Sequence, residues 1–182
     1  TDFTVTQPAP LTFTPTADAQ TKSNSATINY GTLSTLRIRE GTPANPTTYH
    51  SYLKFVVCGL SGPVTSAKLR VFVTDASING GSVFGTDNAW VETTITWSNA
   101  PAPGTLHGSI GPLALNAWTE IPLPASVFTG GNGTYSFVLT SAGDDSAIFS
   151  SREGTNRPEL IVEQSIVAPP TIQSFQPASG PV

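Results

Sequence analysis

Short runs in which polar and apolar residues alternate are the feature that most constrains the fold of this chain. Clear examples are residues 34–40 (STLRIRE), 51–60 (SYLKFVVCGL) and 67–75 (AKLRVFVTD). A period of two is the pattern of β-strands that bury one face. No window repeats apolar residues at positions i, i+3, i+4 and i+7, as an amphipathic helix would. The chain is therefore predicted to be all-β.

Turn-forming residues separate these runs. The 182 residues include 16 glycines and 16 prolines, which interrupt helices and favour turns. The pattern indicates about ten short antiparallel strands at intervals of roughly 8–15 residues, which is typical of a sandwich or barrel. We expect a β-sandwich.

Composition divides the chain into three parts. Residues 1–10 are predicted to be a linker, and residues 11–165 hold the strand pattern. Residues 166–182 contain PTIQSFQPASGPV, which resembles the first strand of an IPT/TIG immunoglobulin-like domain, although an unstructured tail is the alternative. Because the sequence starts with Thr-Asp-Phe and has no methionine, we expect a piece of a longer protein.

The overall charge excludes some classes of partner. The formal net charge is −4, which argues against binding of nucleic acids or anionic membranes through bulk electrostatics. No apolar run reaches the 18 residues or so that a membrane-spanning helix needs. We therefore predict neither a nucleic-acid partner nor a membrane span.

The few basic residues gather at the polar positions of the alternating strands. Those expected on outward faces are Arg37, Arg39, Lys54, Lys68 and Arg70. Guanidinium and ammonium groups arranged in this way suit the carboxylates or sulfates of an anionic ligand. The alternatives are protection of sheet edges and pairing with Glu40, Glu92 or Glu120.

Three further residues complete the predicted binding surface. Tyr30 and Tyr52 are expected to be exposed and to stack on a sugar ring, and Arg152 in the loop SSREGTNRP is expected to close one end. The three tryptophans, Trp90, Trp97 and Trp118, could also stack on sugars, but tryptophans in β-sandwiches more often belong to the core.

No catalytic set can be assembled from the sequence. His50 and His107 have no nucleophile-elbow serine or cysteine and no HExxH or HxH partner, so we predict a protein that is not an enzyme. Asp18, Asp144 and Asp145 are candidate ligands of a structural calcium ion, or else turn carboxylates that accept hydrogen bonds from backbone N–H groups. No other cofactor is expected.

The single cysteine limits the covalent chemistry of the chain. Cys58 has no partner for an internal disulfide. It follows Val57 at the end of an alternating run, and we expect it to be a small buried hydrophobic residue.

Several motifs together resemble a known family. PTADAQ, LRIRE, SYLKF, ITWSNAP and SSREGTNRPEL occur in the order and spacing of DNRLRE-domain proteins, now treated as the family 96 carbohydrate-binding module, from Leu11 to Gln164. The resemblance implies a jelly-roll sandwich, secretion by bacteria or archaea to the medium or cell surface, and binding of alginate. Val56 stands where the family usually has aspartate, and Cys58 where serine is common.

Two functional hypotheses follow. The preferred one is a non-catalytic module of a secreted multidomain protein that binds an acidic polysaccharide, such as alginate, on a basic sheet face. The alternative is a structural or adhesive module of a cell-surface or filament protein, which assembles with neighbouring domains through β-strand contacts. Basic residues without acidic partners favour the first hypothesis, and basic residues each matched to a glutamate favour the second.

Overall fold

Eleven strands and two short 3-10 helices make up the described part of the chain. A computed structural model describes residues 8–165, so the expectations for residues 1–7 and 166–182 lie outside it. The strands are β1 (Leu11–Phe13), β2 (Ala17–Lys22), β3 (Thr35–Ile38), β4 (Tyr49–Val57), β5 (Val64–Asp75), β6 (Gly81–Thr86), β7 (Leu106–Ile110), β8 (Trp118–Leu123), β9 (Gly133–Ser141), β10 (Ala147–Ser150) and β11 (Glu159–Gln164), with the helices η1 (Ser23–Ser25) and η2 (Ala125–Phe128).

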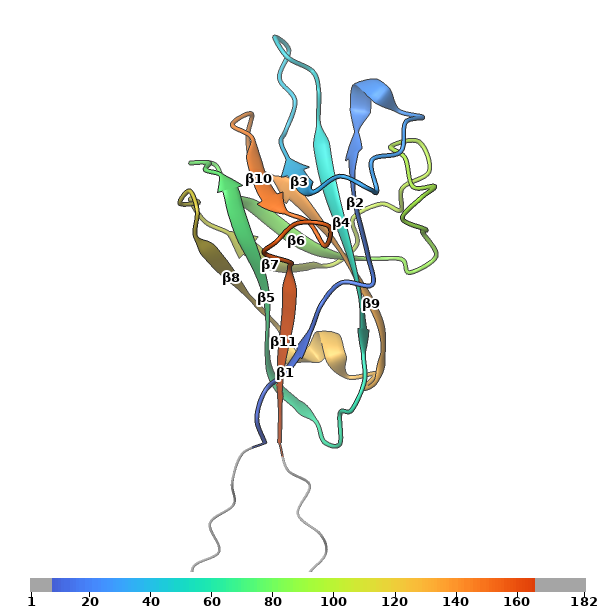
Figure 1. Cartoon of the computed structure of the whole chain (residues 1–182), viewed down its shortest axis with the longest axis vertical. Coiled ribbons are helices and arrows are strands. Elements are labelled where there is room, and N and C mark those ends of the chain that lie inside the picture. Colours follow the sequence, from blue (N-terminus) through green and yellow to red (C-terminus); the bar gives the residue numbers. More distant parts are fainter. Residues whose placement is uncertain (1–7, 166–182) are drawn as a thin grey trace, which may run out of the picture.

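The strands form two antiparallel sheets. One has the order β1-β11-β5-β10-β3, with β8 also paired to β5, and the other has the order β2-β4-β9-β6-β7. Figure 1 shows the two sheets packed into a β-sandwich. The predicted fold class, an all-β sandwich, is therefore confirmed.

The main core lies between the sheets and follows the predicted alternation. Leu53, Phe55 and Val57 of β4 and Leu69 and Val71 of β5 are almost completely buried. Because side chains alternate across a strand, Lys54, Lys68 and Arg70 point to outer faces, as expected.

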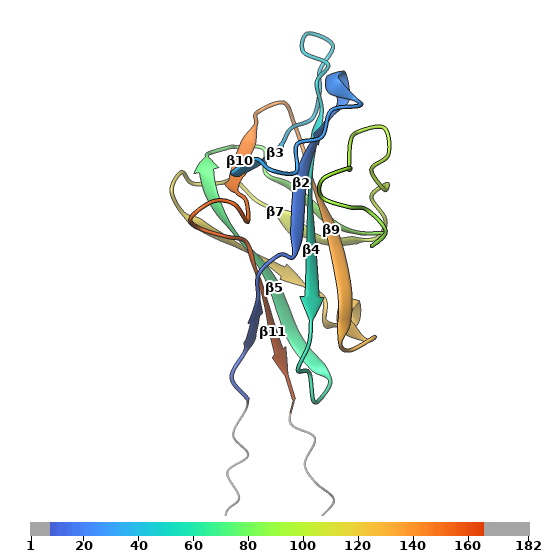
Figure 2. The ribbon, with the colours of Figure 1, turned by 45° about the vertical axis from the view of Figure 1, so that its right-hand side comes forward.

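A smaller cluster of buried residues lies on the outer face of the β2-β4-β9 sheet. Tyr52 and Val138 of that face pack against Trp90 and Ile95, which belong to the long segment 87–105 between β6 and β7. Figures 1 and 2 show this segment lying alongside β2 and β4. The outer face of β4 is thus covered by protein, which explains why few of its side chains are exposed.

Two predictions about the exposure of side chains are wrong, one for Tyr52 and one for Cys58. Tyr52 is only 2% exposed, because segment 87–105 covers it and its hydroxyl donates to the carbonyl of Pro101 at 3.0 Å. Tyr52 therefore cannot stack on a sugar. Cys58 is exposed instead of buried, because β4 ends at Val57, which takes the last inward position. Among the tryptophans, Trp90 is buried, as expected for a core residue. Trp97 and Trp118 are half-buried.

The first and last described strands lie side by side. β1 pairs with β11, so both ends of the described chain leave from the same end of the sandwich (Figure 1). The opposite end carries η1 and the long connection between β3 and β4. Within residues 8–165, no helix has the length and apolar character needed to cross a membrane.

Candidate functional site

The basic residues of β5 are matched by glutamates on both neighbouring strands. Lys68 Nζ lies 2.8 Å from Glu120 Oε2, and Arg70 Nη1 lies 2.9 Å from Glu159 Oε2. The Arg70 guanidinium also lies 4.2 Å from the ring centroid of Trp118. The prediction that some basic residues pair with glutamates is correct for this face, and its positive charge is largely neutralised.

Lys54 belongs to the other sheet and is covered by segment 87–105. Its ammonium donates to the carbonyl of Asn88 at 3.0 Å and to the carbonyl of Trp90, and it lies 4.4 Å from the centre of the Trp90 ring. Burial lowers the pKa of Lys54, with Asp87 acting in the opposite direction. Lys54 thus contacts the protein itself, in a position that holds the segment on the sheet.

Three other basic residues surround Tyr49, and we call them the upper basic cluster: Lys22, Arg37 and Arg39. Lys22 on β2 is the cross-strand partner of Tyr49, and Arg39 bridges Tyr49 from the other side. The Arg37 guanidinium lies 5.0 Å from the centroid of the Tyr49 ring, and Lys22 Nζ lies 5.8 Å from it. The ring therefore fixes two of the three positive charges close together.

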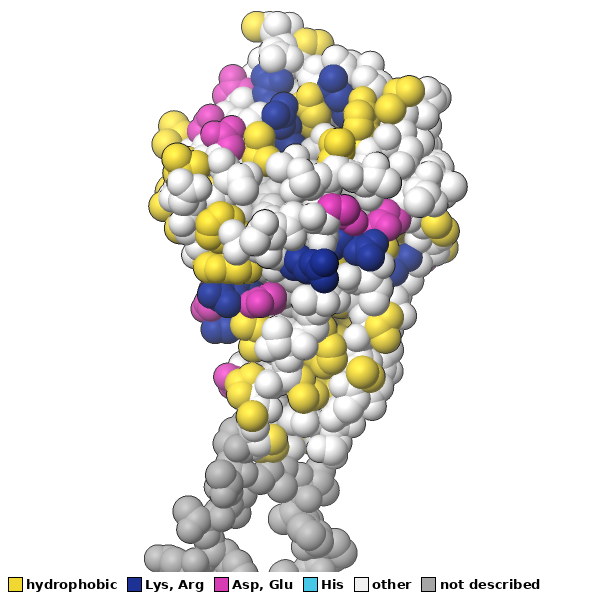
Figure 3. Space-filling model, in the orientation of Figure 1, with side chains coloured by type: hydrophobic (Ala, Val, Ile, Leu, Met, Phe, Trp, Pro, Cys, Tyr) yellow, Lys and Arg dark blue, Asp and Glu magenta, His cyan; other side chains and the backbone are white. Residues whose placement is uncertain are grey.

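The upper basic cluster differs from the β5 face in its partners. Arg39 donates to two backbone carbonyls, those of Asp144 (2.9 Å) and Thr47 (3.4 Å). Among residues 8–165, no carboxylate lies within 4.0 Å of Lys22, Arg37 or Arg39. Figure 3 shows the basic side chains on this face in separate groups, with acidic side chains in the neighbourhood of each. The basic residues predicted from the alternating strands are thus divided: within residues 8–165, Lys68 and Arg70 pair with glutamates, whereas Arg37 and Arg39 do not.

A group of carboxylates lies where three segments meet. Asp18 of β2, Glu92 of segment 87–105 and Glu153 of the loop after β10 each bring one oxygen within 4.8 Å of the others. Arg152 Nη1 donates to both oxygens of Glu92, at 2.8 and 2.7 Å. Burial raises the pKa of Asp18 to about 8, against the effect of the backbone N–H of Arg152, which donates to Asp18 Oδ2 at 2.7 Å.

The predicted calcium ligands are therefore separated. Asp145 accepts a hydrogen bond from the backbone N–H of Ile78, and Asp144 is exposed. Neither belongs to the carboxylate group around Asp18. Asp145 therefore fits the alternative prediction, in which a turn carboxylate accepts a hydrogen bond from a backbone N–H. Arg152 lies beside this group, where its guanidinium donates to Glu92.

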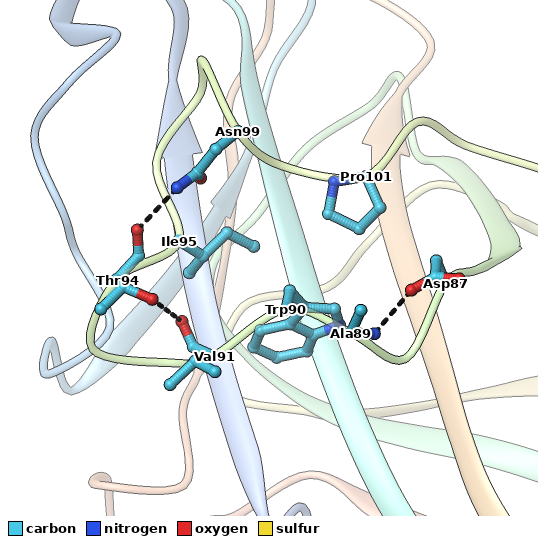
Figure 4. Close-up of a pocket in the computed structure, with 8 residues that line it drawn as sticks. All are labelled: Asp87, Ala89, Trp90, Val91, Thr94, Ile95, Asn99 and Pro101. Atoms are coloured by element: carbon cyan, nitrogen blue, oxygen red, sulfur yellow. Dashed lines mark hydrogen bonds between the residues drawn. The ribbon is translucent and has the colours of Figure 1, made fainter.

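Segment 87–105 also encloses a surface hollow of about 340 Å³. Trp90, Ile95 and Pro101 supply its apolar wall, and Asp87 and Asn99 its polar groups (Figure 4). Asp87 accepts from the N–H of Ala89 at 2.6 Å, and Asn99 donates to the carbonyl of Thr94 at 3.0 Å. These polar groups are already used to shape the segment.

A second hollow, of about 200 Å³, lies on the same side of the sandwich. It is lined by His50 and Trp97, whose ring centroids lie 4.9 Å apart, and by Pro101 and Pro103. Tyr30, the other predicted stacking residue, is half-buried and forms an isolated bridge with Gln20. Trp97, which is half-buried, is the tryptophan that lines this second hollow.

Sequence reasoning missed several residues of these sites. In the sequence, Lys22 looks like an ordinary surface lysine. Tyr49 lies just before the SYLKF motif, and no sequence pattern marks it as part of a site. Glu153 lies in the motif SSREGTNRPEL and Glu92 lies three residues before ITWSNAP, so pairing these two regions across the fold could have found them.

Similarity to one protein family extends over most of the chain. No curated protein matches the chain. The model of one family matches residues 9–164, which is nearly all of the described sandwich. On this match, the chain belongs to carbohydrate-binding module family 96.

Proposed function

We propose that this module binds an acidic polysaccharide, with alginate as the reference ligand, at the upper basic cluster. The observation that carries the proposal is that Lys22 and Arg37 lie over the Tyr49 ring and Arg39 is the bridge partner of Tyr49, all three without a carboxylate within 4.0 Å among the described residues. The family makes a carbohydrate the class of ligand. The charge of the cluster makes an anionic sugar the better match within that class.

The geometry suggests how a uronate would be held. The Arg37 guanidinium offers a planar fork that can donate two hydrogen bonds to one carboxylate, and the Lys22 ammonium adds a point charge beside it. Tyr49 is only 9% exposed, so it would position the two cations and not stack on the sugar. Because each exposed ion pair contributes only about 0–1 kcal/mol, affinity would come from several uronate units.

The position of the cluster suits a module within a larger protein. Lys22 ends β2 and Tyr49 begins β4, at the end of the sandwich remote from the paired strands β1 and β11 (Figure 1). Neighbouring domains attached at the chain ends would leave the cluster accessible. Secretion, which the family resemblance implies, is part of this proposal because polysaccharides of this kind are extracellular.

The experiment is a calorimetric titration of the domain with alginate oligomers, with neutral mannan and xylan as comparison ligands. Binding to alginate alone, weakening as salt shortens the Debye length from about 10 Å at 0.1 M to about 3 Å at 1 M, is the expected result. The variant Lys22→Gln/Arg37→Gln should lose about three- to tenfold in affinity.

The matched control is Lys68→Gln, which removes a lysine that already pairs with Glu120. It should bind alginate as the wild type does. Equal losses in this control and in the cluster variant would show that only net charge matters and would contradict a defined site. Absence of binding to all three polysaccharides would favour the alternative of a structural or adhesive module that assembles through β-strand contacts.

A further inference from the structure

The carboxylates of Asp18, Glu92 and Glu153 have the arrangement of a cation site. They come from three segments that are far apart in the sequence, and one oxygen of each lies within 4.8 Å of the other two. Oxygens around a calcium ion lie about 2.3–2.6 Å from it, so ligands on opposite sides are separated by about that distance doubled. The three side chains could therefore contact one ion together.

The second observation is an orphaned oxygen. Asp18 is 1% exposed, and its Oδ1 is buried with no hydrogen-bond partner, while Oδ2 accepts from the N–H of Arg152. A buried polar atom without a partner is costly. A cation bound among the three carboxylates would give this oxygen a partner.

Arg152 does not complete this site. Arg152 Nη1 lies 2.7 Å from Glu92 Oε2 and is paired with that carboxylate. The same nitrogen lies 3.7 Å from Glu153 Oε1. When all three carboxyl groups are ionised, as they would be around a bound cation, the three carboxylates and one guanidinium carry a formal charge of −2 in a partly buried place. A divalent cation would neutralise this charge. Among residues 8–165, Arg152 is the one basic side chain that forms an ion pair with these carboxylates.

We propose that Asp18, Glu92 and Glu153 bind a calcium ion that joins β2, segment 87–105 and the loop after β10. An all-oxygen ligand set without histidine or cysteine favours calcium over zinc and other transition metals. Glu153 is exposed, which gives the ion a route in and room for water ligands. This site is separate from the upper basic cluster, and the inference does not depend on the proposed function.

The structural consequence concerns segment 87–105. Lys54 holds its beginning through the carbonyls of Asn88 and Trp90, and the ion would hold it at Glu92. Asn29 adds two hydrogen bonds, to the carbonyls of Glu92 and Ile95, both at 2.7 Å. The ion would thus be part of what fixes the segment that forms the hollow of Figure 4.

The test uses the protein without polysaccharide, because alginate itself binds calcium. The domain is stripped with EGTA and its thermal unfolding is followed as CaCl2 is added. At a hundredfold excess over Kd, we expect the Tm to rise by roughly 5–10 °C. Terbium provides a direct readout, because Trp90, two residues from Glu92, can transfer energy to an ion bound there.

Three variants decide the outcome. Asp18→Asn and Glu153→Gln should lose both the calcium-induced rise in Tm and the terbium emission, and Glu153→Gln keeps the test valid if Asp18→Asn fails to fold, because Glu153 is exposed. Asp75→Asn, an exposed carboxylate outside the group, should behave as the wild type. The proposal is overturned if calcium leaves the wild-type Tm unchanged, or if Glu153→Gln responds as fully as the wild type.

Discussion

Lys54 and Trp90 are joined twice across the outer face of the β4 sheet. The Lys54 ammonium lies 4.4 Å from the centre of the Trp90 ring and also donates a hydrogen bond to the Trp90 carbonyl. Trp90 in turn donates from its indole nitrogen to Ser136 Oγ at 3.2 Å. A lysine in the middle of a strand therefore has a structural explanation, since it holds a long segment against the sheet.

The first prediction follows from this relationship. Lys54→Met keeps most of the aliphatic stem but removes both hydrogen bonds and the cation–π contact. We expect the free energy of unfolding to fall by about 1–3 kcal/mol, measured by urea denaturation. The control Lys22→Met removes a lysine whose ammonium lies 5.8 Å from the centre of the Tyr49 ring, and it should change stability by less than about 0.5 kcal/mol. Similar losses in the two variants would contradict the role assigned to Lys54.

The strand pattern could be predicted from the sequence because it depends on local alternation. The runs around Leu53 and Leu69 place their apolar residues in the core as expected. Tyr52 could not be placed correctly, because its burial depends on a segment that begins 35 residues later. Alternation predicts which residues share a face, but not whether another part of the chain covers that face.

The candidate sites were harder to predict than the fold. Sequence alone could not show that Lys54 and Lys68 lie on different sheets, because sheet order is set by pairing between distant strands. The carboxylate group has the same origin: Asp18 and Glu153 are separated by most of the chain and meet only in the folded sandwich. Residue types suggested an anionic ligand and a calcium ion, and the fold decided which residues are available to hold them.

The second prediction concerns two glycines with positive φ. Gly80 has φ +58°, and an added Cβ would lie 1.9 Å from the carbonyl oxygen of Ile110, whereas Gly131 has φ +71° with open space around it. Gly131→Ala should cost about 1–2 kcal/mol for the left-handed backbone alone. Gly80→Ala adds a clash with the backbone and should cost more than about 3 kcal/mol. Midpoints of denaturant unfolding check both values, and equal costs would contradict the close packing of Gly80 against β7.

The third prediction concerns Cys58, which is exposed just after β4. A thiol-specific reagent should label one thiol per molecule in the folded protein, at a rate similar to that in urea. Cys58→Ser should abolish labelling and leave stability nearly unchanged, because little packing is lost. Labelling that requires unfolding would show that the thiol is covered in solution and would restore the buried position expected from the sequence.

The last prediction is a loss of stability in mild acid caused by His50. Burial lowers the pKa of His50 below its usual 6.5, with Glu40 acting in the opposite direction. The unfolded chain therefore takes up a proton near pH 6.5 while the folded protein does not, so the free energy of unfolding falls as the pH drops below that value. His50→Gln should reduce this fall between about pH 7.5 and about pH 5, as measured by urea denaturation at each pH. His107, whose pKa burial also lowers, is the matched comparison, and the double variant should have the weakest pH dependence in this range. An unchanged slope in His50→Gln would show that His50 is solvated in the folded protein and that its contact with Trp97 does not exclude water.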